Sequence, residues 1–440
     1  MTERHAANQK EAGILAIKAG VDVGISVEDA YMGGLIENVN EGKIPMSLVD
    51  RAVARILRLK FKLGLFENPY VNVDHAVKTV HTDANRDLAL ETSRQSIVLL
   101  KNDKNLLPLK KDIKSIAVIG PDADAPVDQL GDYYPHHVPQ EVVTVLKGIQ
   151  NKVGSKTKIT YVKGCNVMGD KVNEIGKAKA AADSADVAIV VVGEQGYVTN
   201  GEGRDMANLE LTGMQQDLVK AIQSTGKPVV VVLINGRALA IPWLADNIPA
   251  IVDAWMCGEQ GGNAIADVLF GDYNPGGKLA VTFPRHSGQF PFYYNSSATK
   301  ARAKYIDMPG TPVYEFGYGL SYTKFEYSNL KLSSKEINKA ADVEVSVDVK
   351  NIGDRKGDEV VQLYINDVIA STSKPTKELK GYERISLNPG ETKTVKLKLT
   401  PEDLSLYDRS MNFIVEPGKF SVMVGSSSKD IKLRDEFEVK

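Results

Sequence analysis

The stretch VAIVVVGEQGYVTNGEGRD, residues 187–205, joins a continuous apolar run to a loop rich in glycine and charge. An apolar run of strand length without polar alternation is typical of a strand buried on both faces, as in parallel sheets. Similar runs separated by helical patterns occur between residues 115 and 256, namely SIAVIG, KITYV, PVVVVLING and AIVDAWM. This alternation predicts an α/β domain with a mainly parallel sheet over residues 89–285.

Beyond residue 325 the pattern changes to a period of two. The stretches with this alternation are DVEVSVDVKNIG, GDEVVQLYIND, KTVKLKLT and FSVMVGSS, and turn signals such as NPGE at 388–391 separate them. Short alternating strands of this kind predict an antiparallel β-sandwich of the immunoglobulin-like type over residues 326–440.

The first 65 residues predict an incomplete piece of structure. Apolar residues recur at helical spacing over 10–19, VDVGIS at 21–26 has the composition of a short buried strand, and a longer amphipathic helix is expected over 49–63. A single α-β-α piece cannot cover both faces of its strand, so we expect a segment N-terminal to it to complete it. Residues 66–88 are polar and punctuated, as in a linker, and 286–325 form a connecting segment rich in proline, glycine and aromatic residues.

Composition excludes several classes of partner. The 440 residues carry a formal charge of −2, which gives no field that would gather nucleic acid or anionic lipid. No apolar run approaches membrane-spanning length. The first 13 residues are polar and contain no apolar h-region, so neither a signal peptide nor an anchor is visible in them. The only cysteines, Cys165 and Cys257, are too few for a disulfide framework. We expect a neutral ligand, and neither nucleic acid nor membrane as a partner.

Two carboxylates, Glu194 and Glu202, lie in the loop after the 187–193 run. Loops at the carboxyl ends of parallel strands converge and form sites. A general acid needs a raised pKa and a mobile position, and Glu202 fits this better because Gly201 and Gly203 flank it. The sheet edge should hold Glu194. The alternative for both is a solvated loop charge.

Three further residues are candidates for binding a ligand. Tyr133 and Tyr134 could present flat faces to a sugar ring, although loop aromatics also serve as packing residues. Arg204 is the third candidate, and its guanidinium is expected to pair with Asp205 rather than with Glu202, whose pKa it would lower.

The sequence predicts neither a cofactor nor a metal. The loops AVIGPDAD and VGEQGYVTNGEG match neither the G-x-G-x-x-G spacing nor a P-loop, so a dinucleotide site is rejected. His136 and His137 lack further ligands at suitable spacing and are interpreted as surface residues.

Five motifs, in this order, resemble glycoside hydrolase family 3, with the closest similarity to the bacterial periplasmic β-glucosidase group. The motifs are RQSIVLLKNDKNLLPL, IAVIGPDAD, VVVGEQGYVTNGEGRD, MCGEQGGNAIADVLFGDYNPGGKLAVTFP and YEFGYGLSYTKF. The resemblance implies a (β/α)8-type barrel, of which residues 1–65 would be the C-terminal remnant, an α/β sandwich, and a fibronectin type III-like domain. It also implies a periplasmic or secreted parent enzyme.

The resemblance further implies a retaining mechanism with an aspartate nucleophile on the barrel and a glutamate acid/base on the α/β sandwich. The acid/base carries over to Glu202, with Glu194 as the fallback, and Tyr133 stands where the family often has a tryptophan that stacks on the sugar. The family's nucleophile lies in a Ser-Asp motif just ahead of a stretch similar to residues 5–25, so it is expected outside this chain. Asp22 belongs to the next strand and is not promoted to nucleophile.

Two hypotheses of function follow. In the first, the chain is part of a retaining β-glucosidase, inactive alone and completed by an N-terminal barrel portion or a companion chain. In the second, it is a noncatalytic carbohydrate-binding or assembly module. An independent hydrolase that uses Glu194 and Glu202 as its pair is least favoured, since one flexible loop is unsuited to holding two carboxyls about 5–5.5 Å apart across a bond. A homodimer would be one way to cover exposed barrel surface.

Overall fold

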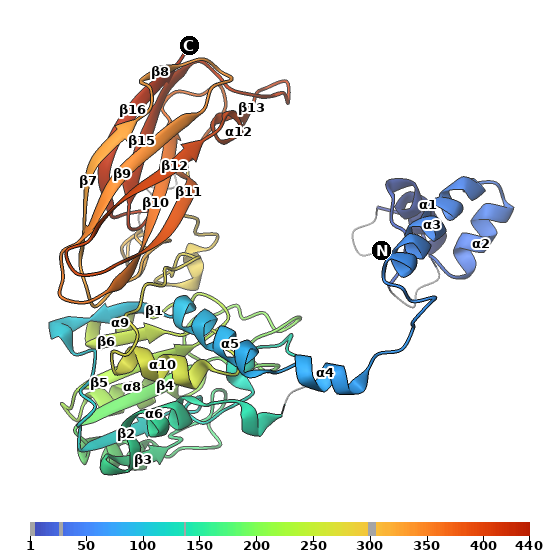
Figure 1. The fold of residues 1–440 in the computed structure, drawn as a ribbon. Coiled ribbons are helices and arrows are strands. Elements are labelled where there is room, and N and C mark those ends of the chain that lie inside the picture. The colour runs from blue at the N-terminus through green and yellow to red at the C-terminus, as the bar shows by residue number, and fades with distance from the viewer. Residues whose placement is uncertain (1–4, 26–29, 136–137, 298–304) are drawn as a thin grey trace. The chain divides into compact units, whose positions relative to one another are not determined.

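The computed structural model describes residues 5–25, 30–135, 138–297 and 305–440. The chain divides into two compact units, Met1–Thr82 and Asp83–Lys440. The division falls inside the predicted linker 66–88, which contains one short helix and the start of the first helix of the second unit. Figure 1 shows the elements of both units.

The first unit contains the helices α1 (Gln9–Ala19), α2 (Gly33–Asn40), α3 (Met46–Lys62) and α4 (Val73–Thr79). Asn8 caps α1 by accepting a hydrogen bond from the backbone N–H of Glu11. The prediction of a buried strand at VDVGIS is wrong over its described residues, 21–25, which are irregular and largely exposed. A parallel strand needs neighbouring strands to bind its backbone groups, and none is present among the described residues of this unit.

The α/β domain is built on a six-stranded sheet with the order β1-β6-β5-β4-β2-β3. All neighbouring strands are parallel except β1, which pairs antiparallel with β6. The five strands expected from the sequence are β2 to β6, whereas β1 lies in the RQSIVLLKN motif and was not predicted as a strand. The strands are β1 (Val98–Asn102), β2 (Ser115–Ile119), β3 (Lys158–Val162), β4 (Val187–Gly193), β5 (Val229–Ile234) and β6 (Ala250–Asp253).

Helices cover both faces of this sheet (Figure 1). Alternate side chains of each strand point into one of two cores: Val190 packs with α7, α8 and α9, and Val191 packs with α5, α6 and α10. Every residue of β4 is buried, as a strand covered on both faces must be. The helices are α5 (Asp83–Ser96), α6 (Val145–Val153), α7 (Ile175–Asp183), α8 (Gln215–Gln223), α9 (Pro242–Asn247) and α10 (Gly261–Leu269).

The C-terminal domain is a sandwich of two main sheets, with the orders β11-β10-β15-β16-β8 and β12-β9-β7. Its core of mainly aliphatic side chains, such as Val347, Leu363 and Val422, lies between these sheets, as predicted from the period-two pattern. The elements are β7 (Phe325–Leu332), β8 (Glu336–Ile337), β9 (Val343–Asn351), β10 (Gly357–Asp367), β11 (Glu378–Leu387), β12 (Thr392–Leu399), α12 (Pro401–Leu404), β13 (Leu406–Tyr407), β14 (Phe413–Ile414), β15 (Gly418–Gly425) and β16 (Ile431–Val439).

Polar contacts join the sandwich to the α/β domain within the second unit. Lys278 forms an ion pair of 3.0 Å with Glu359 of β10, and both side chains are largely buried. Arg384 of β11 donates to the carbonyl of Gln95 at 3.1 Å and to the hydroxyl of Tyr273 at 2.9 Å. The junction between the two domains is therefore held by defined polar contacts.

Two further observations concern membrane-spanning helices and the state of the two cysteines. Within the described ranges no helix is long and apolar enough to cross a membrane. Cys165 and Cys257 are both free thiols and both buried, so they do not form a bridge with one another.

Candidate active site at the carboxyl edge of the parallel sheet

The strand order itself marks a position for a site. β2 and β4 are neighbours in the sheet, but the chain passes through β3 between them. The helix after β2, α6, packs on one face of the sheet, and the helix after β4, α8, packs on the other. The loops that leave β2 and β4 therefore diverge, and such a switch point is where parallel sheets form their binding crevice. Both predicted glutamates and both predicted tyrosines lie on these two loops.

Glu194 lies directly after β4 and is only 4% exposed. Its Oε1 pairs with Arg237 Nε at 2.8 Å, and its Oε2 accepts from Asn200 Nδ2 and from the Gly236 amide, each at 2.9 Å. Burial raises the pKa of Glu194, although the Gly236 amide, Arg237 and Asn200 all oppose this shift. Both carboxylate oxygens are thus bonded inside the protein, and the side chain is almost fully buried.

Glu202 lies in an exposed position near the middle of the same loop, which runs from residue 194 to 214. Its Oε2 accepts a hydrogen bond of 2.7 Å from the Tyr133 hydroxyl. Gly201 and Gly203 have φ angles of +122° and +72°, a region that glycine reaches without strain. The flanking glycines and the accessible carboxyl are what a proton donor needs to lean onto a bound substrate.

The two loops lock together through Asp132. Its Oδ1 accepts from the Tyr197 amide at 3.0 Å, and its carbonyl accepts from the Tyr197 hydroxyl at 2.6 Å. A Cβ atom at Gly201 would lie 1.5 Å from Asp132 Oδ2, so only glycine permits this approach. The loop after β2 thereby fixes the loop that carries Glu202.

The three predicted ligand-binding residues surround Glu202 in different ways. Tyr133 is 82% exposed and uses its hydroxyl to hold Glu202, and this contact is the main cause that raises the pKa of Tyr133. Tyr134 is less exposed and meets the Tyr197 ring edge to face, with centroids 5.9 Å apart. Arg204 donates from Nε to the Tyr197 carbonyl.

The expected pair between Arg204 and Asp205 is wrong: no ion pair joins these two residues, both of which are described. Arg204 instead donates to the carbonyl of Tyr197, because the loop folds back on itself between residues 197 and 204. His136 and His137 lie outside the described residues, so their interpretation as surface residues is untested.

Sequence reasoning missed several buried acids near this edge. Burial raises the pKa of Asp122 well above its ordinary value, that of Asp128 to about 6 and that of Asp253 to about 8. Asp128 accepts from the Gly196 amide, so it also supports the Glu202 loop. Asp122 and Asp253 each follow or end an apolar strand, and an acid in that position is the signal that could have singled them out.

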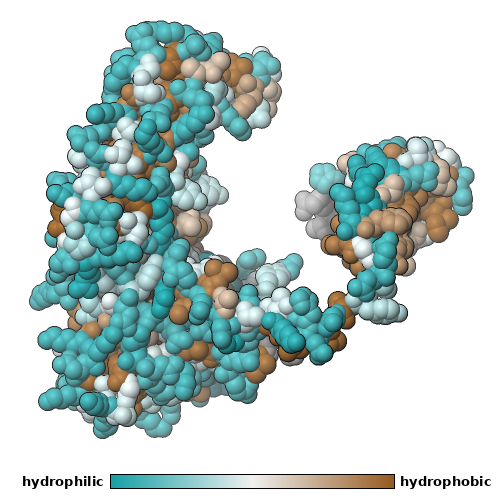
Figure 2. Space-filling view, in the orientation of Figure 1, coloured by the Kyte–Doolittle hydropathy of each residue, from teal (hydrophilic) through white to brown (hydrophobic). Residues whose placement is uncertain are grey.

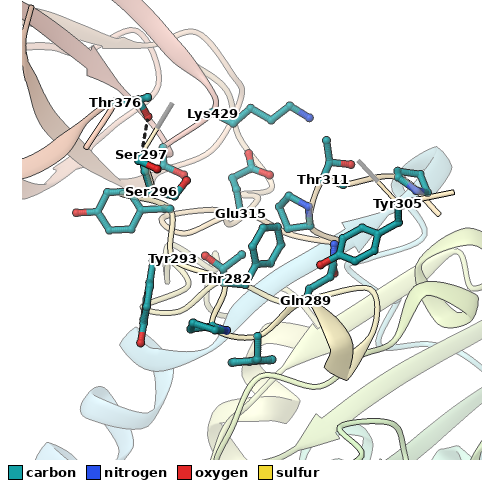
Figure 3. A pocket seen from close by; sticks show the side chains of 18 of the residues that line it. Thr282, Gln289, Tyr293, Ser296, Ser297, Tyr305, Thr311, Glu315, Thr376 and Lys429 are labelled. Carbon is teal, nitrogen blue, oxygen red and sulfur yellow. Dashed lines mark hydrogen bonds between the residues drawn. The ribbon is translucent and has the colours of Figure 1, made fainter. Parts of the chain in front are cut away.

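Two hollows lie near the connecting segment. An apolar one of about 780 Å³ is lined by Met206, Arg237, Trp255 and Phe292 among others. A larger one of about 1140 Å³ is bordered by Glu315, Tyr305 and sandwich residues such as Lys429 (Figure 3). None of its described lining residues comes from the two loops around Glu202. Among the described residues no cluster of three metal-ligating side chains occurs either.

Comparison with known proteins decides the family. Residues 97–322 match the model of the glycosyl hydrolase family 3 C-terminal domain, and residues 359–428 match that of the fibronectin type III-like domain. The chain belongs to glycoside hydrolase family 3. The first match covers most of the α/β domain and the connecting segment, and the second lies within the sandwich.

Several family 3 members align with nearly the whole chain. A β-xylosidase of Formosa agariphila is 44% identical over 96% of this chain and 60% of its own length, and a periplasmic β-glucosidase of Salmonella typhimurium is 42% identical over 97% and 60%. A Listeria innocua β-glucosidase in complex with isofagomine superposes with a TM-score of 0.92 at 37% identity, over 100% of this chain and 62% of its own. The chain thus spans about 60% of these relatives.

Proposed function

We propose that this chain supplies the general acid/base of a retaining β-glucosidase, and that Glu202 is that residue. The observation that carries the proposal is the contrast between the two loop glutamates. Glu202 is exposed, flanked by glycines and held by Tyr133 alone among the described side chains, whereas Glu194 is buried with both oxygens bonded. A proton donor must reach an oxygen of the substrate, and the accessible carboxyl of Glu202 supports its assignment to this role.

The reaction would proceed in two balanced steps. Protonated Glu202 gives its proton to the glycosidic oxygen as the C1–O bond breaks, and that oxygen keeps the bonding electron pair while an aspartate carboxylate attacks C1. The resulting glycosyl ester is then hydrolysed: the Glu202 carboxylate takes a proton from water, the water oxygen bonds to C1, and the aspartate leaves. Both carboxyl groups return to their first state. The aspartate would belong to the N-terminal barrel portion.

The first unit carries the surface onto which that barrel portion would pack. Val53, Leu57 and Phe61 recur every four residues along one side of α3, and all three are exposed. Brown apolar patches are visible on this unit in Figure 2. An amphipathic helix normally buries such a side against a core. We propose the missing strands and helices of the barrel as the occupant, on the same polypeptide or a companion chain.

The substrate proposed is a glucoside or oligosaccharide with a terminal β-linked glucose. The names of the relatives include both β-glucosidase and β-xylosidase, so the assay must compare the two sugars. Because one relative is named a periplasmic enzyme, we propose a periplasmic or secreted location for the complete protein.

Complementation tests the proposal. The chain is mixed with a barrel-portion polypeptide that ends in the Ser-Asp motif, and release of p-nitrophenol from its β-glucoside and β-xyloside is measured. Activity should appear only in the mixture and should be lost with Glu202→Gln. A folded complex without activity, or full activity of the variant, would contradict the proposal. The native mass of the mixture separates a heterodimer from a homodimer of this chain.

The module hypothesis predicts a different result. A noncatalytic carbohydrate-binding module should bind glucose or cello-oligosaccharides by itself. Calorimetry on the chain alone would then show saturable binding, whereas the proposed division of the site predicts none without the barrel portion.

A further inference from the structure

We propose that Glu194 and Arg237 form a clamp that positions the Glu202 loop, so that Glu194 acts through Glu202 rather than as an acid itself. The inference rests on the proposed role of Glu202 as proton donor. It assigns a positioning function to the residue that sequence reasoning kept as the fallback acid, and to Arg237, which the sequence had not singled out.

The clamp begins at the carboxyl ends of two adjacent strands. Glu194 follows β4, and Arg237 lies three residues after the end of β5, so the rigid sheet fixes both backbones. Their ion pair of 2.8 Å is shielded, with side-chain exposures of 6% for Glu194 and 23% for Arg237. Shielding matters because an ion pair in low dielectric is screened little by water or salt.

From this fixed pair, hydrogen bonds reach both ends of the segment that carries Glu202. Arg237 Nη2 donates to the Thr199 carbonyl at 2.7 Å and to the Arg204 carbonyl at 3.5 Å. Glu194 Oε2 accepts from Asn200 Nδ2 at 2.9 Å. The clamp therefore holds the residues just before and just after Gly201, Glu202 and Gly203.

Thr199 strengthens the near end of the segment. It is fully buried, and its hydroxyl accepts from the Gln195 amide at 2.8 Å. The clamp leaves untouched only the three residues between the two anchored ends, and two of them are glycines. Glu202 is thereby limited to a short arc, which shortens the search for the geometry in which it protonates a leaving oxygen.

Local proteolysis tests the clamp on the chain alone, without any need for activity. A glutamate-specific protease that cuts between Glu202 and Gly203 needs the loop to open, so the cutting rate reports the opening equilibrium. Arg237→Gln and Glu194→Gln should each accelerate this cut by at least about tenfold. Arg237→Lys should accelerate it by less, because an ammonium keeps the charge opposite Glu194 although it cannot span both partners as a planar guanidinium does.

Glu359→Gln provides the matched control. The Lys278–Glu359 ion pair has a similar length of 3.0 Å and exposures of 12% and 7%, but it joins the sandwich to the α/β domain and does not touch the loop. This variant should lose global stability as the clamp variants do, and leave the cut after Glu202 within about twofold of the parent rate. Equal acceleration in control and clamp variants would overturn the proposal.

A second readout uses the complemented enzyme and separates positioning from a merely structural role. A leaving group of low pKa, such as 2,4-dinitrophenol, departs without a proton, whereas an alkyl alcohol needs one. Arg237→Gln should lower kcat/KM on alkyl β-glucosides at least about tenfold more than on the dinitrophenyl glucoside, because kcat/KM covers only the steps up to the glycosyl ester and leaves out its hydrolysis. An equal loss on both would overturn the clamp. If no mixture is active, the proposed function fails while the proteolysis result still decides the clamp.

Discussion

Asp253 is a buried acid whose state of ionisation can be tested through stability. Its side chain is fully buried at the end of β6, where Oδ1 accepts from the Trp255 amide at 3.2 Å. The Trp255 amide and the Asn235 side chain both favour the charged form, but burial outweighs them. Burial raises its pKa from 3.8 to about 8. The folded chain therefore holds a proton on Asp253 at neutral pH that the unfolded chain releases.

The sign and size of the effect follow from this difference. Because the folded pKa lies above the unfolded one, the stabilisation is complete below about pH 4 and is lost as the pH rises toward 8. Each pH unit in that window costs about 1.4 kcal/mol, so between pH 5 and 7 the contribution falls by about 3 kcal/mol. Asp253→Asn keeps the acceptor for Trp255 and cannot ionise, so it removes this dependence.

Chemical denaturation at pH 5, 6 and 7 measures the effect. The difference in unfolding free energy between the parent chain and Asp253→Asn should fall steadily over this range, leaving the variant relatively more stable at pH 7. Asp186→Asn is the control, because hydrogen bonds from Ser115 lower the pKa of Asp186 and its titration ends below pH 5. A constant difference for Asp253→Asn would refute the account of a neutral buried acid.

Three other predictions concern the loop, an ion network and a thiol. Gly201→Ala should destabilise the chain by about 1–2 kcal/mol, because residue 201 has a positive φ, and its Cβ should displace Asp132. Gly176→Ala is the control and should cost little, because the space around its Cβ is open. Chemical denaturation measures the free energy of unfolding of both variants. Asp267→Asn should cost about 1–3 kcal/mol in the same assay, since it removes the carboxylate that Arg94 and Lys152 share. The cost stays below that of an unpaired buried charge because Glu91 and Asp272 still pair with these cations. Burial raises the pKa of the Cys257 thiol to about 12, so a thiol reagent should label it only after unfolding, and rapid labelling of the native chain would contradict its burial.

The elements that the sequence predicted are those whose pattern is local. Strands such as β4 are continuous apolar runs, and the strands of the sandwich alternate, so each period indicates its sheet type without knowledge of neighbours. The strand expected at 21–26 failed for the opposite reason. Its composition suits a parallel strand, but a strand forms only where partners bind its backbone, and the described residues of that unit supply none.

In the candidate site, too, the sequence predicts features with a local signal and misses those that depend on partners distant in sequence. Glycines on both sides of Glu202 are visible in the sequence, and the side chain is exposed as expected, while its mobility stays a prediction. The partner of Glu194 is not visible, because Arg237 lies on the next strand connection and meets it only through the parallel pairing of β4 and β5. The neutral state of Asp253 likewise depends on burial by residues distant in sequence.

Chemical rescue tests the central claim most directly. In the complemented enzyme, Glu202→Ala should nearly abolish turnover of p-nitrophenyl β-glucoside while still forming the glycosyl ester from the dinitrophenyl glucoside. Added azide, which attacks C1 without base assistance, should restore turnover and yield the β-glucosyl azide. If azide rescues nothing in Glu202→Ala but rescues Glu194→Ala, the proton donor is Glu194 and the assignment made from the exposed loop is wrong.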